Sequence, residues 1–287
     1  MDNIFIERPK EYLGKPLISF GAKHDEFRLA LDCVANRQKD TELFVVEGLW
    51  AYGKIIEMKI EVVLFMFCPE YIVTEQDMET VKGMIAIAGK SGYISEGLCQ
   101  RLTDRDSSEG FFAVYRYPKT GPQDIRLSEN NVVMILDGLE KPGNIGTIIR
   151  STEGAGGDAV IYVNGKVRLT HNRIIMSSLG GSLTLPVFEM KADDCVKWLA
   201  ENGFTVYLTE LDGERLFCED GLYEGRVAIV AGNEIRGVSG IWRESGLKTV
   251  GVRIPMYGRC DSLNVGFAAT MAAYEATLKQ KGLRSGK

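Results

Sequence analysis

The stretch ILDGLEKPGNIGTIIRSTEGAGG, residues 135–157, combines the end of an apolar strand with the beginning of a helix. The apolar run ends at Asp137, a Pro-Gly turn follows, and Asn144 stands where a side chain can cap a helix. Gly146 keeps the helix surface open, and Arg150 comes six residues after Asn144. An ordinary capped helix with a solvated arginine explains part of this pattern but not the whole combination. Nothing in the stretch has the pattern of a nucleophile, a metal site or a phosphate loop.

The residues around this stretch predict an α/β domain. Val- and Ile-rich runs predict strands at 131–137, 158–163, 185–188, 204–210, 226–232 and 248–255. Helical periodicity predicts helices at 144–156, 172–181, 193–203 and 262–280. Continuous apolar strands between helices are typical of a mostly parallel sheet with both faces covered. Ligands of such sheets bind beyond the carboxyl ends of the strands. The loops concerned follow Asp137, Thr209, Gly232 and Pro255.

The first half of the chain predicts a smaller α/β unit. Its expected elements are a helix at 27–37, a strand at 43–48, a helix at 49–59, a strand at 62–68 and a helix–strand–helix set ending near 102. A further strand and then a Pro/Gly turn occur within 111–130. The predicted organisation is an irregular N-terminal extension at 1–20, a small α/β domain at 21–110, a linker at 111–130 and the main domain at 131–287.

Composition and charge narrow the class of protein. A chain of 287 residues is long enough for two domains, and its net charge of −5 argues against a general nucleic-acid coat without excluding a local basic groove. Six scattered cysteines without a CxxC pair, and only two histidines, argue against a zinc site or a disulfide framework. No apolar run is long enough to span a bilayer, and the start lacks the apolar region of a signal peptide. We therefore expect a cytoplasmic protein with no metal and no membrane partner.

Two glycine patterns suggest nucleotide binding, but neither fits. In GMIAIAGKS, residues 83–91, the first glycine stands five residues before the Gly-Lys-Ser instead of four, so the phosphate loop would have the wrong size. Gly154, Gly156 and Ala159 leave a predicted helix and enter a strand, which reverses the order of the dinucleotide fingerprint. These mismatches argue against a small-molecule enzyme that uses a nucleotide.

Two later segments carry polar residues at strand ends. In VAIVAGNEIRGVS, residues 227–239, a buried strand ends in Gly-Asn-Glu, which can be a plain turn or can offer backbone amides to a ligand with Glu234 as a fixed carboxylate. In VRIPMYGRCDSLNVGFAATMAAYEA, residues 252–276, Ser262 can be merely a helix cap. The small apolar residues after Asn264 predict a closely packed helix, which can also face another subunit.

Taken together and in this order, PGNIGTIIR, AGNEIRG and IPMYGRCDSLNV resemble the three motifs of the SpoU/TrmH branch of the SPOUT RNA methyltransferases, over about residues 131–281. The segment SSLGGSLTLPV, residues 177–187, resembles the family's stretch between the first two motifs. More loosely, the first half resembles the ribosomal-protein-like RNA-binding domain often fused to this family, with FVVEG as its recognisable piece. Gly266 and Phe267 depart from the family's usual serine and small β-branched residue, which concerns helix packing more than chemistry.

The resemblance implies a fold and an activity. The fold is an α/β domain whose mostly parallel sheet contains a deep trefoil knot, an exception to the rule against knotted chains, and the protein is expected to be a homodimer. The activity is transfer of a methyl group from S-adenosylmethionine to a ribose 2′-hydroxyl of RNA. By resemblance, Gly232, Ile254 and Leu263 line the cofactor pocket. Thr209, Asn233 and Met256 lie near it.

The catalytic residues implied by the resemblance are Arg150, Asn144, Glu234, Ser262 and Asn264. A guanidinium has a pKa above about 12 and is a poor base at neutral pH. We therefore expect Arg150 to grip a neighbouring phosphate and to stabilise developing alkoxide charge, while the four polar residues hold it and the ribose in place.

Large-subunit 23S ribosomal RNA is the expected substrate, because transfer-RNA members of the family often lack the additional domain. A transfer-RNA 2′-O-methyltransferase is the first alternative. A non-catalytic RNA-binding member of the fold is the second, and the presence of Arg150, Glu234 and Asn264 argues against it.

Overall fold

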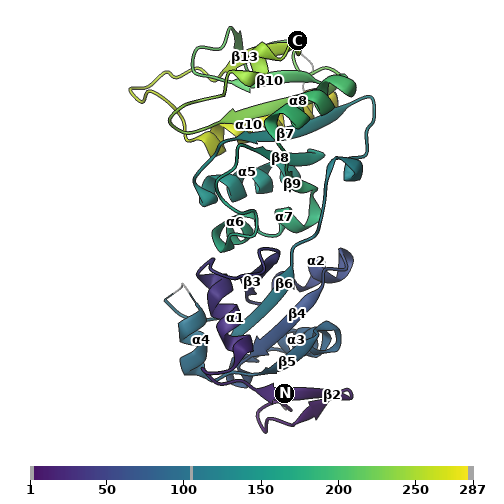
Figure 1. Ribbon diagram of the computed structural model, residues 1–287, viewed down its shortest axis with the longest axis vertical. Helices are drawn as coiled ribbons and strands as arrows, with labels where there is room; N and C mark the ends of the chain where they lie inside the picture. Colours follow the sequence, from purple (N-terminus) through teal and green to yellow (C-terminus); the bar gives the residue numbers. More distant parts are fainter. Residues whose placement is uncertain (1–2, 104–105, 284–287) are drawn as a thin grey trace. The chain divides into compact units, whose positions relative to one another are not determined.

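A computed structural model describes residues 3–103 and 106–283, so the ends of the predicted extension and of the predicted main domain lie outside the described part. The chain forms two compact units (Figure 1). One extends to Pro118 and includes Thr170–Met176, and the other contains Lys119–Leu169 and the chain from Ser177 onward. The break after Pro118 falls within the stretch 111–130, and the roles assigned to the two units stay predictions.

The first unit contains a mixed six-stranded sheet in the order β1-β2-β5-β4-β6-β3. Its strands are β1 (Glu11–Tyr12), β2 (Lys15–Ser19), β3 (Leu43–Glu47), β4 (Val62–Phe67), β5 (Lys90–Tyr93) and β6 (Phe111–Arg116). Its helices are α1 (Asp25–Val34), α2 (Tyr52–Glu57), the short 3-10 helix η1 (Pro69–Tyr71), α3 (Glu75–Ile87) and α4 (Glu96–Leu102). Figure 1 shows α1 and α4 on one side of this sheet and α2 and α3 on the other.

Two expectations for the first unit are wrong in detail. The stretch 1–20 is not irregular throughout, because β1 and β2 form a hairpin and β2 pairs in parallel with β5. A five-residue strand containing Lys15 and Pro16 gives little local signal, and its pairing partner lies more than seventy residues away. Residues 111–116 are not linker, because β6 lies between β4 and β3 in the sheet.

The second unit contains a seven-stranded sheet in the order β11-β13-β10-β12-β7-β8-β9. Its strands are β7 (Asn131–Asp137), β8 (Ala159–Val163), β9 (Val187–Glu189), β10 (Thr205–Thr209), β11 (Arg215–Leu216), β12 (Arg226–Gly232) and β13 (Thr249–Arg253). The helices of residues 119–283 are η2 (Pro122–Asp124), α5 (Pro142–Ala155), α6 (Asn172–Ser178), α7 (Gly181–Thr184), α8 (Ala192–Glu201), α9 (Ile241–Glu244) and α10 (Val265–Gln280). Each pairing of neighbouring strands described in this sheet is parallel, which confirms the predicted class of fold.

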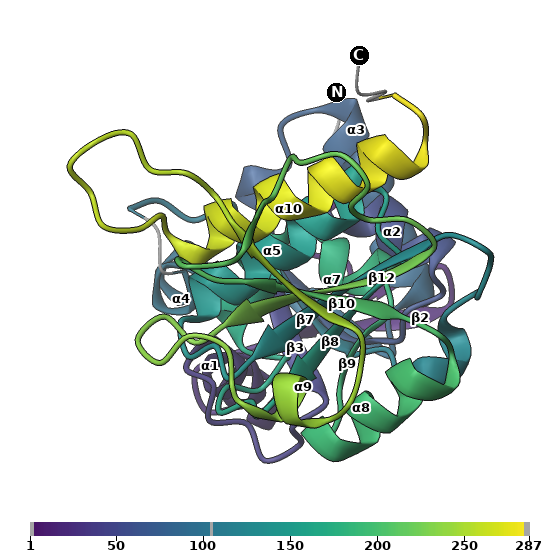
Figure 2. The same ribbon diagram turned by 90° about the horizontal axis from the view of Figure 1, so that it is seen from above.

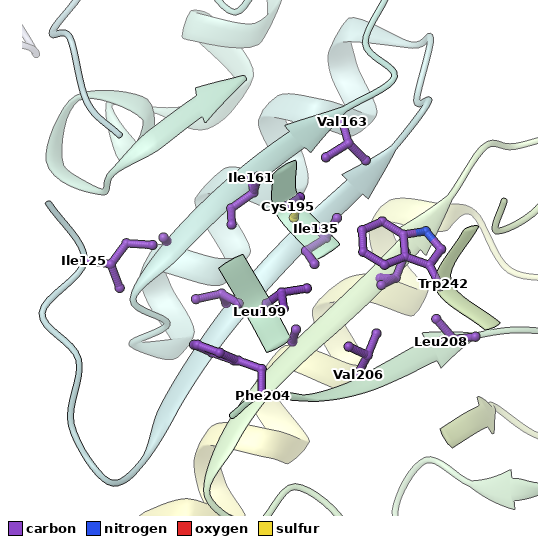
Figure 3. Close-up of a cluster of buried hydrophobic side chains, with 14 of the residues drawn as sticks. Ile125, Ile135, Ile161, Val163, Cys195, Leu199, Phe204, Val206, Leu208 and Trp242 are labelled. Carbon is purple, nitrogen blue, oxygen red and sulfur yellow. The ribbon is translucent and has the colours of Figure 1, made fainter. Parts of the chain in front are cut away.

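Helices cover both faces of this parallel sheet. Figure 2 shows α5 and α10 on one face and α8 and α9 on the other. Between the sheet and the second pair lies a core that includes Ile135, Ile161, Leu199 and the fully buried Trp242 (Figure 3). This double cover explains why β7 and β12 read as continuous apolar runs. The knotted path implied by the family resemblance stays a prediction.

The structure also divides the helix predicted at 172–181. It forms as α6 and α7, because Leu179 and Gly180 both have positive φ angles and interrupt the helical path. The short elements α9 and β11 were not expected, since four and two residues give no measurable periodicity. Within the described residues, no helix is both long and apolar enough to cross a lipid bilayer.

Candidate active site

The predicted ligand-binding loops leave the same edge of the seven-stranded sheet. Gly232 at the end of β12 is in register with Asp137 at the end of β7. Thr209 at the end of β10 pairs with Ala231 on one side and with Val252 on the other. Because parallel strands end together, the loops that carry the three motifs begin at one edge of the sheet, after β7, β12 and β13, with β10 between the last two.

In the first motif, α5 begins two residues earlier than the predicted helix 144–156. The helix starts at Pro142 with Lys141 as its N-cap, so Asn144 lies inside the first turn and does not cap it. Proline at the first helical position costs no hydrogen bond and presets the backbone angle, which favours this earlier start. The side chain of Asn144 is therefore available for contacts outside its own helix.

Asn144 joins residues of the other two motifs. Its Nδ2 donates to Oε1 of Glu234 at 2.9 Å, and its Oδ1 accepts from Nδ2 of Asn264 at 3.2 Å. A longer bond of 3.4 Å joins the backbone N–H of Glu140 to Oε2 of Glu234. Three polar side chains, one from each motif, thus form a single hydrogen-bonded chain. Glu234 and Asn264 are 90 and 120 positions away from Asn144 in the sequence.

The third motif ends in a capped helix. Asn264 is the N-cap of α10, and its Oδ1 accepts from the backbone N–H of Gly266 at 2.8 Å, so Ser262 is not the cap. A β-carbon built on Gly266 would lie 3.0 Å from Oδ1 of Asn264, which is a tight contact, and 3.5 Å from Cγ2 of Thr147 on α5, which is an ordinary one. Glycine at this position therefore leaves room for the capping side chain of Asn264, and α10 still packs against α5.

Arg150 lies apart from this polar chain. It is exposed on α5, six positions after Asn144, which corresponds to about 9 Å along the axis and a different face. In the described part of the chain, Arg150 has no hydrogen bond with Asn144, Glu234, Ser262 or Asn264. The structure therefore brings three of the five predicted catalytic residues together, while the exposed Ser262 and Arg150 stand outside the network.

A second helix packs against the backbone at Arg150. The β-carbon position of Gly181, at the start of α7, lies 3.4 Å from Cα of Arg150. Any residue larger than glycine would bring its side chain onto α5 at this point. This contact fixes the backbone of Arg150 at its Cα. The side chain is exposed, so an anion in solution can reach its guanidinium.

The second motif forms a tight loop whose shape depends on glycine. A β-carbon on Gly232 would lie 2.3 Å from the carbonyl carbon of Gly237 and 2.4 Å from N of Val238, so no side chain fits. Asn233 and Gly237 exchange two backbone hydrogen bonds of 2.9 Å. The Oδ1 of Asn233 also accepts from the backbone N–H groups of Ile235 and Arg236. The side chain of Asn233 therefore builds the loop and does not point to a ligand.

The other predicted cofactor residues occupy two places. Oγ1 of Thr209 donates to the carbonyl of Val230 at 2.8 Å, and Ile254 directly follows β13, so both lie at the strand edge with Gly232. Met256 and Leu263 lie on the loop between β13 and α10, with Leu263 37% exposed. At the end of this loop, Nδ2 of Asn264 donates to Oδ1 of Asn144 and so connects the loop to the hydrogen-bonded chain.

Sequence reasoning missed two charged positions at this edge. Asp137 accepts hydrogen bonds from three different segments, although it was noticed only as the end of a strand. Glu140 pairs with Lys166 of the loop after β8 at 2.6 Å, and this hydrogen bond lowers the pKa of the Glu140 carboxyl. Asp137 is the last residue of β7 and Glu140 comes three positions later, so their place at a strand end was the available signal. Within the described residues, no group of three or more His, Cys, Asp or Glu side chains could hold a metal ion.

Comparison with known proteins agrees with the three motifs. The pattern of the SpoU rRNA Methylase family matches residues 131–274, about half of the 287 residues. The chain belongs to the SpoU rRNA methylase family. The matched segment begins with β7 and ends within α10, so the SpoU region contains every residue assigned to the site.

Several SpoU relatives are similar in sequence. The chain is 29% identical over 181 residues to the 23S rRNA (guanosine(2553)-2′-O)-methyltransferase RlmP of Bacillus subtilis, covering 63% of this chain and 70% of that protein. It is 34% identical over 158 residues to the 23S rRNA (guanosine-2′-O-)-methyltransferase RlmB of Xanthomonas axonopodis, covering 53% of this chain and 60% of that protein.

Solved structures are similar over both units. A crystal structure of an RNA 2′-O ribose methyltransferase matches with a TM-score of 0.75 and 27% identity, over 92% of this chain and 98% of that one. The SpoU methyltransferase AviRb of Streptomyces viridochromogenes, solved with the cofactor AdoMet, matches with a TM-score of 0.80 and 21% identity, over 92% of this chain and 100% of that one. The second likeness concerns the fold alone.

Proposed function

We propose that this protein is an S-adenosylmethionine-dependent RNA methyltransferase that methylates a ribose 2′-hydroxyl in 23S ribosomal RNA, in the cytoplasm. The observation that carries the proposal is the chain Glu234–Asn144–Asn264, which joins one residue from each family motif at the carboxyl edge of the sheet. Relatives named as 23S rRNA 2′-O-methyltransferases support the substrate. We assign the first unit to RNA recognition, because all motif residues lie in the second.

The loop around Gly232 suits a cofactor that is held by main-chain atoms. Gly232 has no room for a side chain, and the neighbouring Thr209 and Asn233 use their side chains to bond the protein itself. The groups left for a ligand at this edge are therefore backbone amides and carbonyls with apolar side chains such as Ile254 and Leu263, which can recognise an adenine ring. S-adenosylmethionine supplies a methyl group that is already activated, because its leaving group is a neutral thioether.

The protein's own residues then have two tasks. Asn144, Asn264 and Glu234 hold one another in fixed positions, so they can align a ribose at the edge of the sheet. Arg150 provides a cation that can grip a phosphate and stabilise the negative charge developing on the attacking oxygen. Its lack of an internal partner in the described residues leaves the guanidinium free for this use.

We infer that the protein is a homodimer through α10. Phe267 is 65% exposed, Met271 37% and Tyr274 42%, and their spacing places them along one face of the helix. An exposed apolar stripe beside the proposed site is typical of a subunit interface.

Replacing Phe267 and Met271 together by aspartate should convert the dimer to a monomer, because two charges would be buried without partners. Sedimentation at micromolar concentration measures this. Leu211→Asp is the matched control, since Leu211 is 70% exposed on a loop far along the chain from α10, and it should leave the dimer intact. A double aspartate variant that still sediments as a dimer would contradict the interface.

Mapping ribose methylation in cells identifies the RNA. Ribosomal and transfer RNA from cells with and without the gene would be compared for 2′-O-methyl groups at every nucleotide. We expect one 23S ribosomal RNA nucleotide to lose its methyl group when the gene is deleted. Loss of a methyl group from a transfer RNA would instead support the alternative substrate.

A further inference from the structure

Asp137 is a buried carboxylate at the end of a strand of the seven-stranded sheet. It is 3% exposed at the carboxyl end of β7. Its Oδ1 accepts from Nδ2 of Asn164 at 2.7 Å, and its Oδ2 accepts from the backbone N–H of Ser239 at 2.9 Å and from Nε1 of Trp242 at 2.8 Å. No cation pairs with it in the described part of the chain. Burying an unpaired charge is costly, so three converging neutral donors indicate a specific task.

This task is to hold the loop of the second motif, residues 233–239. At its start, Nδ2 of Asn233 donates to the carbonyl of Gly138 at 2.7 Å. At its end, the N–H of Ser239 donates to Asp137. Asp137 and Gly138, which are consecutive at the end of β7, therefore hold the two ends of the loop. Between these two anchors lies Glu234, which accepts from Asn144.

The anchor is itself fixed by the core. Trp242 is fully buried on α9 and packs among the side chains between the sheet and α8 (Figure 3). Its indole N–H shares Oδ2 of Asp137 with the N–H of Ser239. The hydrogen bond from this closely packed side chain therefore helps to hold the Asp137 carboxylate in place.

We propose that Asp137 is a positioning residue, which together with the Gly138 carbonyl holds the loop 233–239 so that Glu234 stays hydrogen-bonded to Asn144. This role rests on the proposed methyl transfer for its catalytic consequence. Asp137 touches neither reacting group and acts through Glu234. The carboxylate's geometry matters more than its charge, since all three donors are neutral.

The first test is a double-mutant cycle. Asp137→Ala should lower the single-turnover rate of methyl transfer by about tenfold or more, and in a Glu234→Ala background it should lower the rate less than about twofold, because the loop's effect passes through Glu234. The melting temperature should fall equally in both backgrounds. An equal fold-loss of rate in both backgrounds would mean that Asp137 is merely structural and would overturn the proposal.

Two further variants keep the test decisive. Asp137→Asn should stay within about threefold of wild type, because its amide oxygen can accept from Ser239 and Trp242 while Asn164 turns to accept from its NH2. Trp242→Phe keeps most of the ring and removes one donor, so it should show a smaller rate loss that also disappears in the Glu234→Ala background. If Asp137→Ala does not fold, this second cycle replaces the first, and a persistent loss there would overturn the proposal.

Hydrogen exchange separates this role from the proposed function. The amides of Ile235 and Arg236 should exchange about tenfold faster in Asp137→Ala, while amides of the first unit stay unchanged. Asp158→Ala is the matched control, since Asp158 accepts from the N–H of Val132 at the opposite end of β7 and should not affect the loop. If wild-type protein transfers no methyl group to RNA, the proposed function fails, yet faster loop exchange would still support the anchor. Unchanged exchange would overturn it.

Discussion

Replacing Arg150 by alanine should reduce methyl transfer to RNA by about 10²-fold or more and leave the affinity for S-adenosylmethionine within about twofold. The charge that develops on the attacking oxygen would lose its positioned cation. The pocket residues would be unaffected, because Arg150 has no hydrogen bond with them in the described residues and its guanidinium extends from an exposed helix position. Arg150→Lys should recover only part of the rate, since an ammonium keeps the charge but lacks the planar fork.

Single-turnover transfer at saturating cofactor and RNA, paired with calorimetric cofactor binding, measures the effect of Arg150→Ala. Lys141→Ala is the matched control, because Lys141 is another exposed cation at the start of the same helix. It should weaken RNA binding a few-fold without changing the saturated rate. A wild-type rate in Arg150→Ala would contradict the mechanism, and lost cofactor binding in a folded variant would move Arg150 into the cofactor site.

Replacing Gly232 by alanine should weaken cofactor binding by roughly 10-fold to 100-fold. The added carbon would meet backbone atoms of Gly237 and Val238 at 2.3 and 2.4 Å, so the loop has to move. Overpacking of this kind costs about 1–3 kcal/mol, and each 1.4 kcal/mol corresponds to a tenfold change in affinity. Because a bound cofactor would require the original loop shape, the free-energy cost of restoring that shape would weaken cofactor binding.

Calorimetric titration with S-adenosylmethionine measures the effect of Gly232→Ala. Gly53→Ala is the matched control, because Gly53 lies in α2 of the first unit and an added β-carbon there meets nothing within 4 Å. It should bind the cofactor as wild type does and be slightly more stable, since alanine favours a helix. Unchanged affinity in a folded Gly232→Ala protein would remove this loop from the cofactor site.

The sequence predicts the parallel sheet well, because burial on both faces leaves long Val/Ile runs such as β7 and β12. It does not predict β2, whose strand conformation depends on pairing with β5, far along the chain. Likewise, Leu179 gives no local indication that the helix predicted there breaks, since a leucine with positive φ is unusual.

For the site, the motif resemblance led to Asn144, Glu234 and Asn264, which the structure joins by hydrogen bonds. Local capping rules placed Asn144 wrongly, because Pro142 begins α5, and the alternative that Ser262 caps α10 is wrong because Asn264 is the cap. No local rule identifies Asp137, whose donors Ser239 and Trp242 lie 102 and 105 positions away. Such a residue is recognised only when the chain is folded.

Transfer of an isotopically labelled methyl group would show directly whether this protein methylates a ribose of 23S ribosomal RNA. Purified protein would be incubated with labelled S-adenosylmethionine and with ribosomal RNA from cells that lack the gene, and the RNA would then be digested to nucleosides for mass spectrometry. We expect the label to appear in one 2′-O-methylated nucleoside of 23S ribosomal RNA, and we expect Arg150→Ala nearly to abolish it. Label on a base instead of a ribose, or no label in RNA at all, would contradict it.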